Sequence, residues 1–171
     1  MESILKRYLI DHLVSNKLIS NVQHGFMNGR STVTNLLQCL NCWYRSIDNR
    51  QSIDVMYIDI AKAFDNVSHS KRIFKLDKYG IRGRFLAWIA CFLQNRTQRV
   101  KSGETFSECS SVTSGVPQGS VLGPVLFLVY INDLSEVLKN CSVSIFADDT
   151  KIYFKADTDN DLQCIQDDID I

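Results

Sequence analysis

The sequence predicts an α+β fold in which helices pack against a mostly antiparallel sheet. In the first fifty residues, apolar side chains recur at the spacing typical of amphipathic helices. Two later segments, residues 53–60 and 142–154, are short and rich in β-branched and aromatic residues, which indicates strands. Helices and strands do not alternate in the rhythm of βαβ units, so a parallel sheet is not expected.

The N-terminal part of the chain is predicted to form two helices and a strand. The first helix runs from about Ser3 to Val14, and a loop with two glycines follows it. Ser31 is a natural N-cap for the second helix, because its hydroxyl can accept a hydrogen bond from the first turn. The apolar residues of that helix recur at helical spacing: Leu36, Leu37, Leu40, Tyr44 and Ile47. Residues 53–60, IDVMYIDI, are expected to form a buried strand.

Glycines and polar clusters divide the rest of the chain into further elements. Gly80 and Gly83 separate two predicted helices, residues 69–79 and 82–95. A hairpin is predicted to follow, with residues 96–101 and 106–113 as its strands. The remaining predicted elements are a buried helix over residues 125–138, two strands within 142–154 joined by a tight turn at Asp148 and Asp149, and the start of an acidic helix that is cut off at Ile171.

The composition is that of an ordinary globular chain, with 45% apolar and 22% charged residues. No apolar run approaches the roughly 20 residues that span a bilayer, and the N-terminus lacks the features of a signal peptide. We therefore expect an intracellular protein with no membrane partner and six reduced cysteines. Cys39 and Cys42 form a CxxC inside a helical pattern, without a second ligand pair, so we expect core or half-buried thiols there rather than a zinc or redox site.

Charge is distributed unevenly although the net charge is zero. Residues 71–101 contain nine Lys or Arg and a single acid, whereas residues 148–171 contain eight Asp and two Lys. The basic segment in the middle of the chain can bind phosphate groups, and the acidic segment at its end can bind cations. Two solvated helix faces explain the same charges equally well.

Three acidic residues interrupt the apolar pattern. Asp59 ends one apolar strand, and Asp148 and Asp149 follow another, SIFA. Buried carboxylates are costly unless something neutralises them, and adjacent acids raise each other's pKa. A divalent cation resolves both problems, and magnesium prefers a few carboxylates together with phosphates and water. From these residues alone, ordinary turn and strand-end positions remain an equally good interpretation.

Four segments resemble motifs of reverse transcriptases, and they occur in that family's order and with family-like spacing. YIDIAKAFDNVSH (residues 57–69) resembles the first palm motif, SGVPQGSVLGPVLFLVYINDL (114–134) the second, and FADDT (146–150) the third. HGFMNGRST (24–32) resembles the fingers segment upstream of them. Each segment is weak or moderate alone, but the ordered set is very specific. The sequences of the PQGSVLGP and FADDT segments are most similar to those of non-LTR, LINE-type elements of animals, jockey-like ones especially.

The resemblance implies a reverse transcriptase palm, an antiparallel sheet with packed helices, plus part of the fingers. Residues 1–171 would form a single partial domain, with partial fingers at about 1–50 and the palm at about 51–171. We expect the thumb to be absent, and the missing fingers and thumb segments to belong to a longer protein. The family's activity is RNA-directed DNA polymerisation, with an RNA or DNA template, a DNA primer and dNTP as partners.

The catalytic residues implied by the resemblance are the three acids. The family uses two Mg²⁺ ions, for which Mn²⁺ is a substitute. Asp59 and Asp148 would be the main ligands with Asp149 beside them, and the backbone carbonyl of Ile60 would join the second metal.

The resemblance also implies a set of dNTP contacts. Phe64, five residues after Asp59, would stack beneath the deoxyribose and exclude a 2′-hydroxyl. Gln118 would contact the incoming nucleotide or a template base, and Gly119 would allow close backbone approach. Arg30 would meet the template or the triphosphate. The competing interpretations are a core aromatic for Phe64 and exposed surface side chains for Gln118 and Arg30.

Basic residues on the predicted hairpin are candidates for nucleic-acid phosphate: Arg96, Arg99 and Lys101. Trp88 and Phe92 behind the hairpin are more typical of a core face. Lys62 is a further candidate for phosphate. For Asp65 and His69 we expect structural roles, a helix cap and a helix start.

Two rival functions remain open at the level of sequence. The first is an inactive truncated remnant that only binds nucleic acid or a partner, but the three acids are intact. The second is a two-metal hydrolase of unrelated fold, which does not explain PQGS or the aromatic five residues after Asp59.

Overall fold

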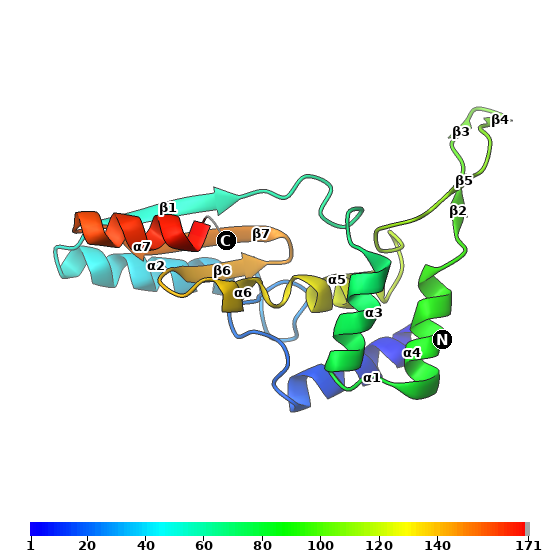
Figure 1. Ribbon diagram of the computed structural model, residues 1–171, viewed down its shortest axis with the longest axis horizontal. Coiled ribbons are helices and arrows are strands. Elements are labelled where there is room, and N and C mark those ends of the chain that lie inside the picture. The colour runs from blue at the N-terminus through cyan, green and yellow to red at the C-terminus, as the bar shows by residue number, and fades with distance from the viewer. Residues whose placement is uncertain (170–171) are drawn as a thin grey trace. The chain divides into compact units, whose positions relative to one another are not determined.

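The computed structural model describes residues 1–169 and divides into two compact units, each built from two segments of the chain (Figure 1). The helical unit comprises Met1–Leu18 and Lys62–Tyr130, and the sheet unit comprises Ile19–Ala61 and Ile131–Ile171. Within the described residues, no helix is long and apolar enough to cross a membrane. The expected domain boundary near residue 50 stays a prediction.

The sheet unit is built on three antiparallel strands in the order β1-β7-β6. Its strands are β1 (Ile53–Ile58), β6 (Ser142–Phe146) and β7 (Asp149–Lys155), and its helices are α2 (Thr32–Asp48), α6 (Leu134–Val137) and α7 (Asp159–Ile169). Val143, Ile145 and Ile152 are buried and form the centre of its apolar core. The sequence predicted the antiparallel sheet and the acidic C-terminal helix, and both predictions are confirmed.

Helix α2 begins where Ser31 was expected to cap it. The Ser31 hydroxyl accepts from the Thr34 amide at 3.2 Å, and the Thr34 hydroxyl accepts from the Ser31 amide at 2.8 Å, which completes a capping box. Buried Asn35 then links the helix to the sheet, because its amide donates to Ser144 and accepts from Lys151. Cys39 is buried and Cys42 half-buried, as predicted.

The strand over Ile53–Ile58 is not buried, contrary to the prediction. It lies at the edge of the sheet and, in the described structure, pairs only with β7. Met56 and Tyr57 are exposed as a result. An apolar run of this length is compatible with either an edge or a central position, and its pairing partners decide which one it takes.

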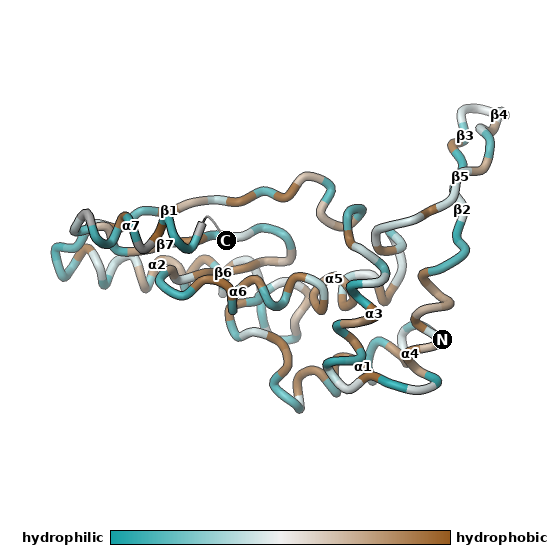
Figure 2. The backbone as a smooth tube through the Cα atoms, viewed as in Figure 1, coloured by the Kyte–Doolittle hydropathy of each residue, from teal (hydrophilic) through white to brown (hydrophobic). Residues whose placement is uncertain are grey.

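The helical unit carries helices α1 (Glu2–Ser15), α3 (His69–Lys78), α4 (Gly83–Leu93) and α5 (Gly123–Ile131). Their apolar residues are visible as brown segments of α3 and α4 in Figure 2. Leu9, Leu76, Ile89 and Leu126 are fully buried, one from each helix. The predicted hairpin consists of two short ladders, one pairing β2 (Thr97–Gln98) with β5 (Ser110–Ser111) and one pairing β3 (Lys101–Ser102) with β4 (Thr105–Phe106).

Two predicted boundaries are wrong. The helix expected over residues 125–138 is interrupted after Ile131, where the Asn132 side chain accepts a hydrogen bond from the Ser20 amide at 2.8 Å instead of facing solvent on a helix. The turn expected at Asp148 and Asp149 lies one residue earlier, at Ala147 and Asp148. Ala147 takes the positive φ of 57° that such two-residue hairpin turns require, and Asp149 already pairs with Phe146.

The cysteines whose side chains are described have free thiols: Cys39, Cys42, Cys91, Cys109 and Cys141. The side chain of Cys164 and the end of the chain at Ile171 lie outside the described residues.

Candidate active site

The strand register brings the three predicted catalytic acids to one end of the sheet. Ile58, the last residue of β1, pairs with Thr150, and Phe146 pairs with Asp149. Asp59 therefore follows β1 at the same end at which the β6–β7 turn carries Asp148 and β7 begins with Asp149 (Figure 1). All three acids belong to the sheet unit.

These acids are accessible rather than buried. Asp59 and Asp149 are exposed and Asp148 is half-buried, so the expected desolvation of the strand-end acids does not occur. Among the side chains that the structure describes, no group of three His, Cys, Asp or Glu is close enough to hold a metal ion. The carboxylate oxygens of the three acids are nevertheless the type of ligand that magnesium prefers. This ion typically binds one or two carboxylates, and phosphates and water occupy its other coordination positions. The Ile60 carbonyl adds another oxygen donor beside Asp59.

Buried Gln23 holds the backbone of the turn that carries Asp148. Its Oε1 accepts from the amides of Ala147 at 2.9 Å and Gly25 at 2.7 Å, and its Nε2 donates to the Ala147 carbonyl at 3.4 Å. A parallel bridge between Gln23 and Ile145 fixes the same segment against β6. Sequence reasoning missed Gln23, since a single polar residue in a predicted loop gives no signal of a contact more than 120 positions away.

Gly25 packs so closely against this turn that a side chain cannot fit. A Cβ there would lie 2.2 Å from the Ala147 nitrogen and 2.8 Å from its Cα. We expect Gly25→Ala to lower the free energy of unfolding by about 1–3 kcal/mol, the range for overpacking, as measured by urea denaturation. Gly29→Ala is the comparison, because nothing lies within 4 Å of the Cβ position of Gly29 and only the backbone strain of its positive φ, 73°, is expected there. Equal losses in the two variants would contradict the steric explanation.

Arg30 supports the segment that carries Gln23. Its Nη1 donates to the carbonyls of Asn21 at 2.5 Å and Gln23 at 2.6 Å. Arg30 thus has a structural role that was not predicted. Its contact with template or triphosphate stays a prediction.

In the helical unit, the residues predicted to bind dNTP lie on two segments that are hydrogen-bonded together. Val116 donates its amide to the Phe64 carbonyl at 2.9 Å, and Gly115 donates its amide to the Val67 carbonyl at 2.8 Å. The Phe64 ring is half-buried and stacks on Phe127 with a centroid distance of 4.1 Å. Packing in the core is therefore one established role of Phe64.

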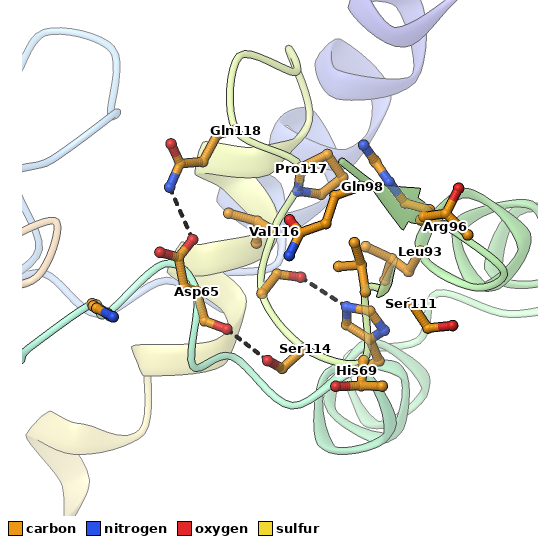
Figure 3. A pocket seen from close by; sticks show the side chains of 15 residues that line it. Asp65, His69, Leu93, Arg96, Gln98, Ser111, Ser114, Val116, Pro117 and Gln118 are labelled. Carbon is orange, nitrogen blue, oxygen red and sulfur yellow. Dashed lines mark hydrogen bonds between the residues drawn. The ribbon is translucent and has the colours of Figure 1, made fainter. Parts of the chain in front are cut away.

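Gln118 is exposed and is held by Asp65. Its Nε2 donates to Asp65 Oδ1 at 2.9 Å (Figure 3). Asp65 is not the cap of α3, as the sequence suggested, because Ser68 occupies that position and its hydroxyl accepts from the Lys71 amide. His69 begins α3 as expected. Gly119 has a φ of 76°, which only glycine adopts readily.

A cavity of about 540 Å³ opens beside these residues in the helical unit (Figure 3). Lys62, His69 and Arg96 line it together with Asp65 and Gln118. Most other lining groups are polar or belong to the loop of residues 111–118. A volume of this size is typical of a small-ligand pocket.

The basic residues of the hairpin are exposed and lie over aromatic rings. Arg99 and Lys101 lie over the Phe106 ring, at 4.1 and 5.5 Å from its centroid. Arg96 lies 5.8 Å from the centroid of Phe92, which itself stacks on Trp88. Trp88 and Phe92 are half-buried, in partial agreement with the core face predicted for them.

Comparison with known proteins identifies the family. The family model described as reverse transcriptase (RNA-dependent DNA polymerase) matches residues 1–170. The chain belongs to the reverse transcriptase family. This confirms the resemblance on which the site residues were chosen, although the role of each residue stays a prediction.

Related reverse transcriptases come from non-LTR retroelements. The chain is 29% identical over 164 residues to the RNA-directed DNA polymerase from mobile element jockey of Drosophila melanogaster, covering 90% of this chain and 18% of the relative. It is 29% identical over 139 residues to the probable RNA-directed DNA polymerase from transposon BS of the same species, covering 78% and 15%. A type-1 retrotransposable element R2 polyprotein of Popillia japonica is 28% identical over 137 residues, covering 78% and 19%. The chain thus spans less than a fifth of the length of these curated relatives.

Solved telomerase structures share the reverse transcriptase fold of this chain. Telomerase from Candida albicans, in complex with a fragment of telomeric RNA, superimposes with a TM-score of 0.71 at 11% identity, covering 95% of this chain and 32% of that one. Apo telomerase from Candida tropicalis gives 0.70 at 12% identity, covering 100% and 34%. The likeness confirms the α+β fold.

Proposed function

We propose that this chain is the core of an RNA-directed DNA polymerase that transfers a nucleotide from dNTP to a primer 3′-hydroxyl on an RNA or DNA template. The observation that carries the proposal is the register that brings Asp59, Asp148 and Asp149 to one end of the sheet in a chain of this family. Family membership supports the general activity, and the roles of individual residues are inferred from their positions.

The three acids would hold divalent cations, Mg²⁺ or its substitute Mn²⁺, with the Ile60 carbonyl as an additional donor. The chemistry that two bound metal ions supply is charge stabilisation of the attacking hydroxyl and of the leaving pyrophosphate. Asp148 lies on a turn whose backbone is hydrogen-bonded to Gln23 at Ala147, which supports a ligand role by fixing where its side chain begins.

Nucleotide recognition would fall to Phe64, Gln118, Gly119 and Arg30. Phe64 would exclude a 2′-hydroxyl by steric contact, since its stacking on Phe127 limits the movement of the ring. Gln118 is exposed and available to a nucleotide through its amide oxygen. Template and primer phosphates would be met by the exposed cations of the hairpin: Arg96, Arg99 and Lys101.

The decisive experiment is primer extension by the 171-residue chain on an RNA template with a DNA primer, dNTPs and Mg²⁺, then Mn²⁺. Incorporation by the wild type that is lost in Asp148→Ala is the expected result. Circular dichroism establishes that both proteins are folded. A folded wild type without incorporation would overturn the proposal of autonomous activity and favour a remnant that only binds nucleic acid or a partner.

Replacement of Phe64 is expected to relax the selection of dNTP over NTP. Phe64→Val removes the ring that would collide with a 2′-hydroxyl, and steric discrimination of this kind amounts to about 10- to 200-fold. We therefore expect the ratio of dCTP to CTP incorporation efficiency to fall by about that factor. Phe74→Val, at an exposed phenylalanine of the same unit, is the control. An unchanged ratio in a folded Phe64→Val protein would leave Phe64 with its packing role alone.

A further inference from the structure

We propose that Asp65 is a positioning residue that orients the side-chain amide of Gln118, so that Gln118 presents its carbonyl oxygen to the nucleotide. The inference rests on the proposed function, in which Gln118 contacts the nucleotide. It starts from the hydrogen bond of 2.9 Å between Gln118 Nε2 and Asp65 Oδ1. Both side chains are exposed, and an isolated surface contact of this kind contributes little because ordering two side chains costs entropy.

The two backbones are already fixed against each other, which reduces that cost. The Ser114 hydroxyl donates to the Asp65 carbonyl at 2.8 Å, and the Val116 amide donates to the Phe64 carbonyl at 2.9 Å. A Cβ at Gly115 would lie 2.9 Å from the Asp65 carbonyl oxygen, so the segments touch at a position that only glycine permits. Asp65 and Gln118 thus face each other across a rigid junction (Figure 3).

Two further side chains hold the loop just before Gln118. His69 Nε2 donates to the Gly115 carbonyl at 2.8 Å, and Arg72 Nη2 donates to the same carbonyl at 3.1 Å. Arg72 is fully buried, and burial lowers its pKa to about 10, which leaves it charged at neutral pH. A buried cation and a histidine therefore anchor the carbonyl of Gly115, three residues before the amide that Asp65 contacts.

The charge of Asp65 selects one orientation of the Gln118 amide. An ionised carboxylate only accepts hydrogen bonds, so it attracts Nε2 and repels Oε1. With Nε2 turned to Asp65, Oε1 remains as an acceptor for an N–H or O–H group of the nucleotide. Without the carboxylate, both orientations of the amide become available and the nucleotide has to select one of them.

A double-mutant cycle tests whether Asp65 acts through Gln118. Asp65→Ala is expected to raise KM for dNTP about fivefold, equivalent to about 1 kcal/mol, with kcat changed less than twofold. In the Gln118→Ala background, Asp65→Ala is expected to have no further effect, because the group it positions is gone. Asp65→Asn, which keeps the shape but lets the amide turn, should raise KM by a smaller factor. Additive effects of the two alanine substitutions would overturn the proposal.

A control and a second readout separate this inference from the proposed function. Asp77→Ala removes an exposed acid of the same unit that pairs with Arg82, and KM is expected to be unchanged. In ¹⁵N-labelled wild type, the Nε2 resonances of Gln118, assigned by their loss in Gln118→Ala, are expected to shift in Asp65→Ala. Unshifted resonances would overturn the positioning role even in an active enzyme. Shifted resonances in an inactive chain would support the contact while counting against the proposed function.

Discussion

Replacing Asp148 by Asn is expected to reduce dNTP incorporation by at least about a thousandfold. Metal-ligating carboxylates contribute several kcal/mol of charge stabilisation in the transition state, and about 4 kcal/mol corresponds to three orders of magnitude. Asp148 lies in the turn whose backbone is held by Gln23, so Asn at this position keeps the fold while losing the charge. The measurement is single-nucleotide incorporation at saturating dNTP, repeated over a range of Mg²⁺ concentrations.

Asp59→Asn should behave in the same way, since Asp59 lies at the same end of the sheet. Asp54→Asn is the matched control: Asp54 is an exposed acid of β1, near the end of that strand opposite to the one that Asp59 follows. We expect it to retain nearly all activity. If Asp54→Asn were as damaging as Asp59→Asn, a general effect of negative charge would replace the metal-ligand assignment.

The sequence predicted best those features that local chemistry determines. The Ser31 cap, the helix that begins at His69 and the β6–β7 hairpin all depend on residues within a few positions of each other. The turn of this hairpin was predicted one residue too late. A pair of aspartates is typical of a turn, but the residue with the positive φ is Ala147. As a result, Asp149 is a strand residue, and Asp148 is the one acid of the two that lies in the turn.

Long-range polar contacts were not predictable. Gln23 and Asp65 looked like a loop residue and a helix cap, yet their partners Ala147 and Gln118 are 124 and 53 positions away. Hydrophobic periodicity shows which face of an element is buried, but it carries no information about which polar group meets which. The edge position of β1 escaped prediction for a similar reason, since it depends on strand pairing.

Asp168 is another such residue, and its loss is expected to destabilise the sheet unit strongly. It is buried, and its carboxylate accepts from the backbone amides of Lys139, Asn140 and Cys141 at 3.0, 2.7 and 3.0 Å. Asp168→Ala leaves three amides without this acceptor. A hydrogen bond to a charged group contributes about 1.5–3 kcal/mol, but Lys139 and Asn140 are exposed, so that their amides can bond water in the variant. We therefore expect a loss of about 3 kcal/mol in the free energy of unfolding at pH 7, less than the sum of three such bonds.

Urea denaturation followed by far-UV circular dichroism measures this loss, and Asp167→Ala is the control. Asp167 is the preceding residue of α7, and its exposed carboxylate accepts only from the Gln163 side chain among the contacts found in residues 1–169. We expect Asp167→Ala to change the free energy of unfolding by less than about 0.5 kcal/mol. Equal losses in both variants would mean that helix α7, rather than the carboxylate of Asp168, determines the stability.

The pH dependence provides an independent check on the same carboxylate. Burial raises the pKa of Asp168, but the amides of Asn140, Lys139 and Cys141 lower it by more, so the folded-state pKa lies below its usual value. The unfolded-state pKa is about 3.9, so the stabilisation is complete above that pH and is lost as the pH falls through the lower, folded-state value. The stability difference between wild type and Asp168→Ala should therefore be constant from pH 7 to about pH 5 and shrink below about pH 4. A difference that stayed constant down to pH 2 would show that the contact does not depend on the charge.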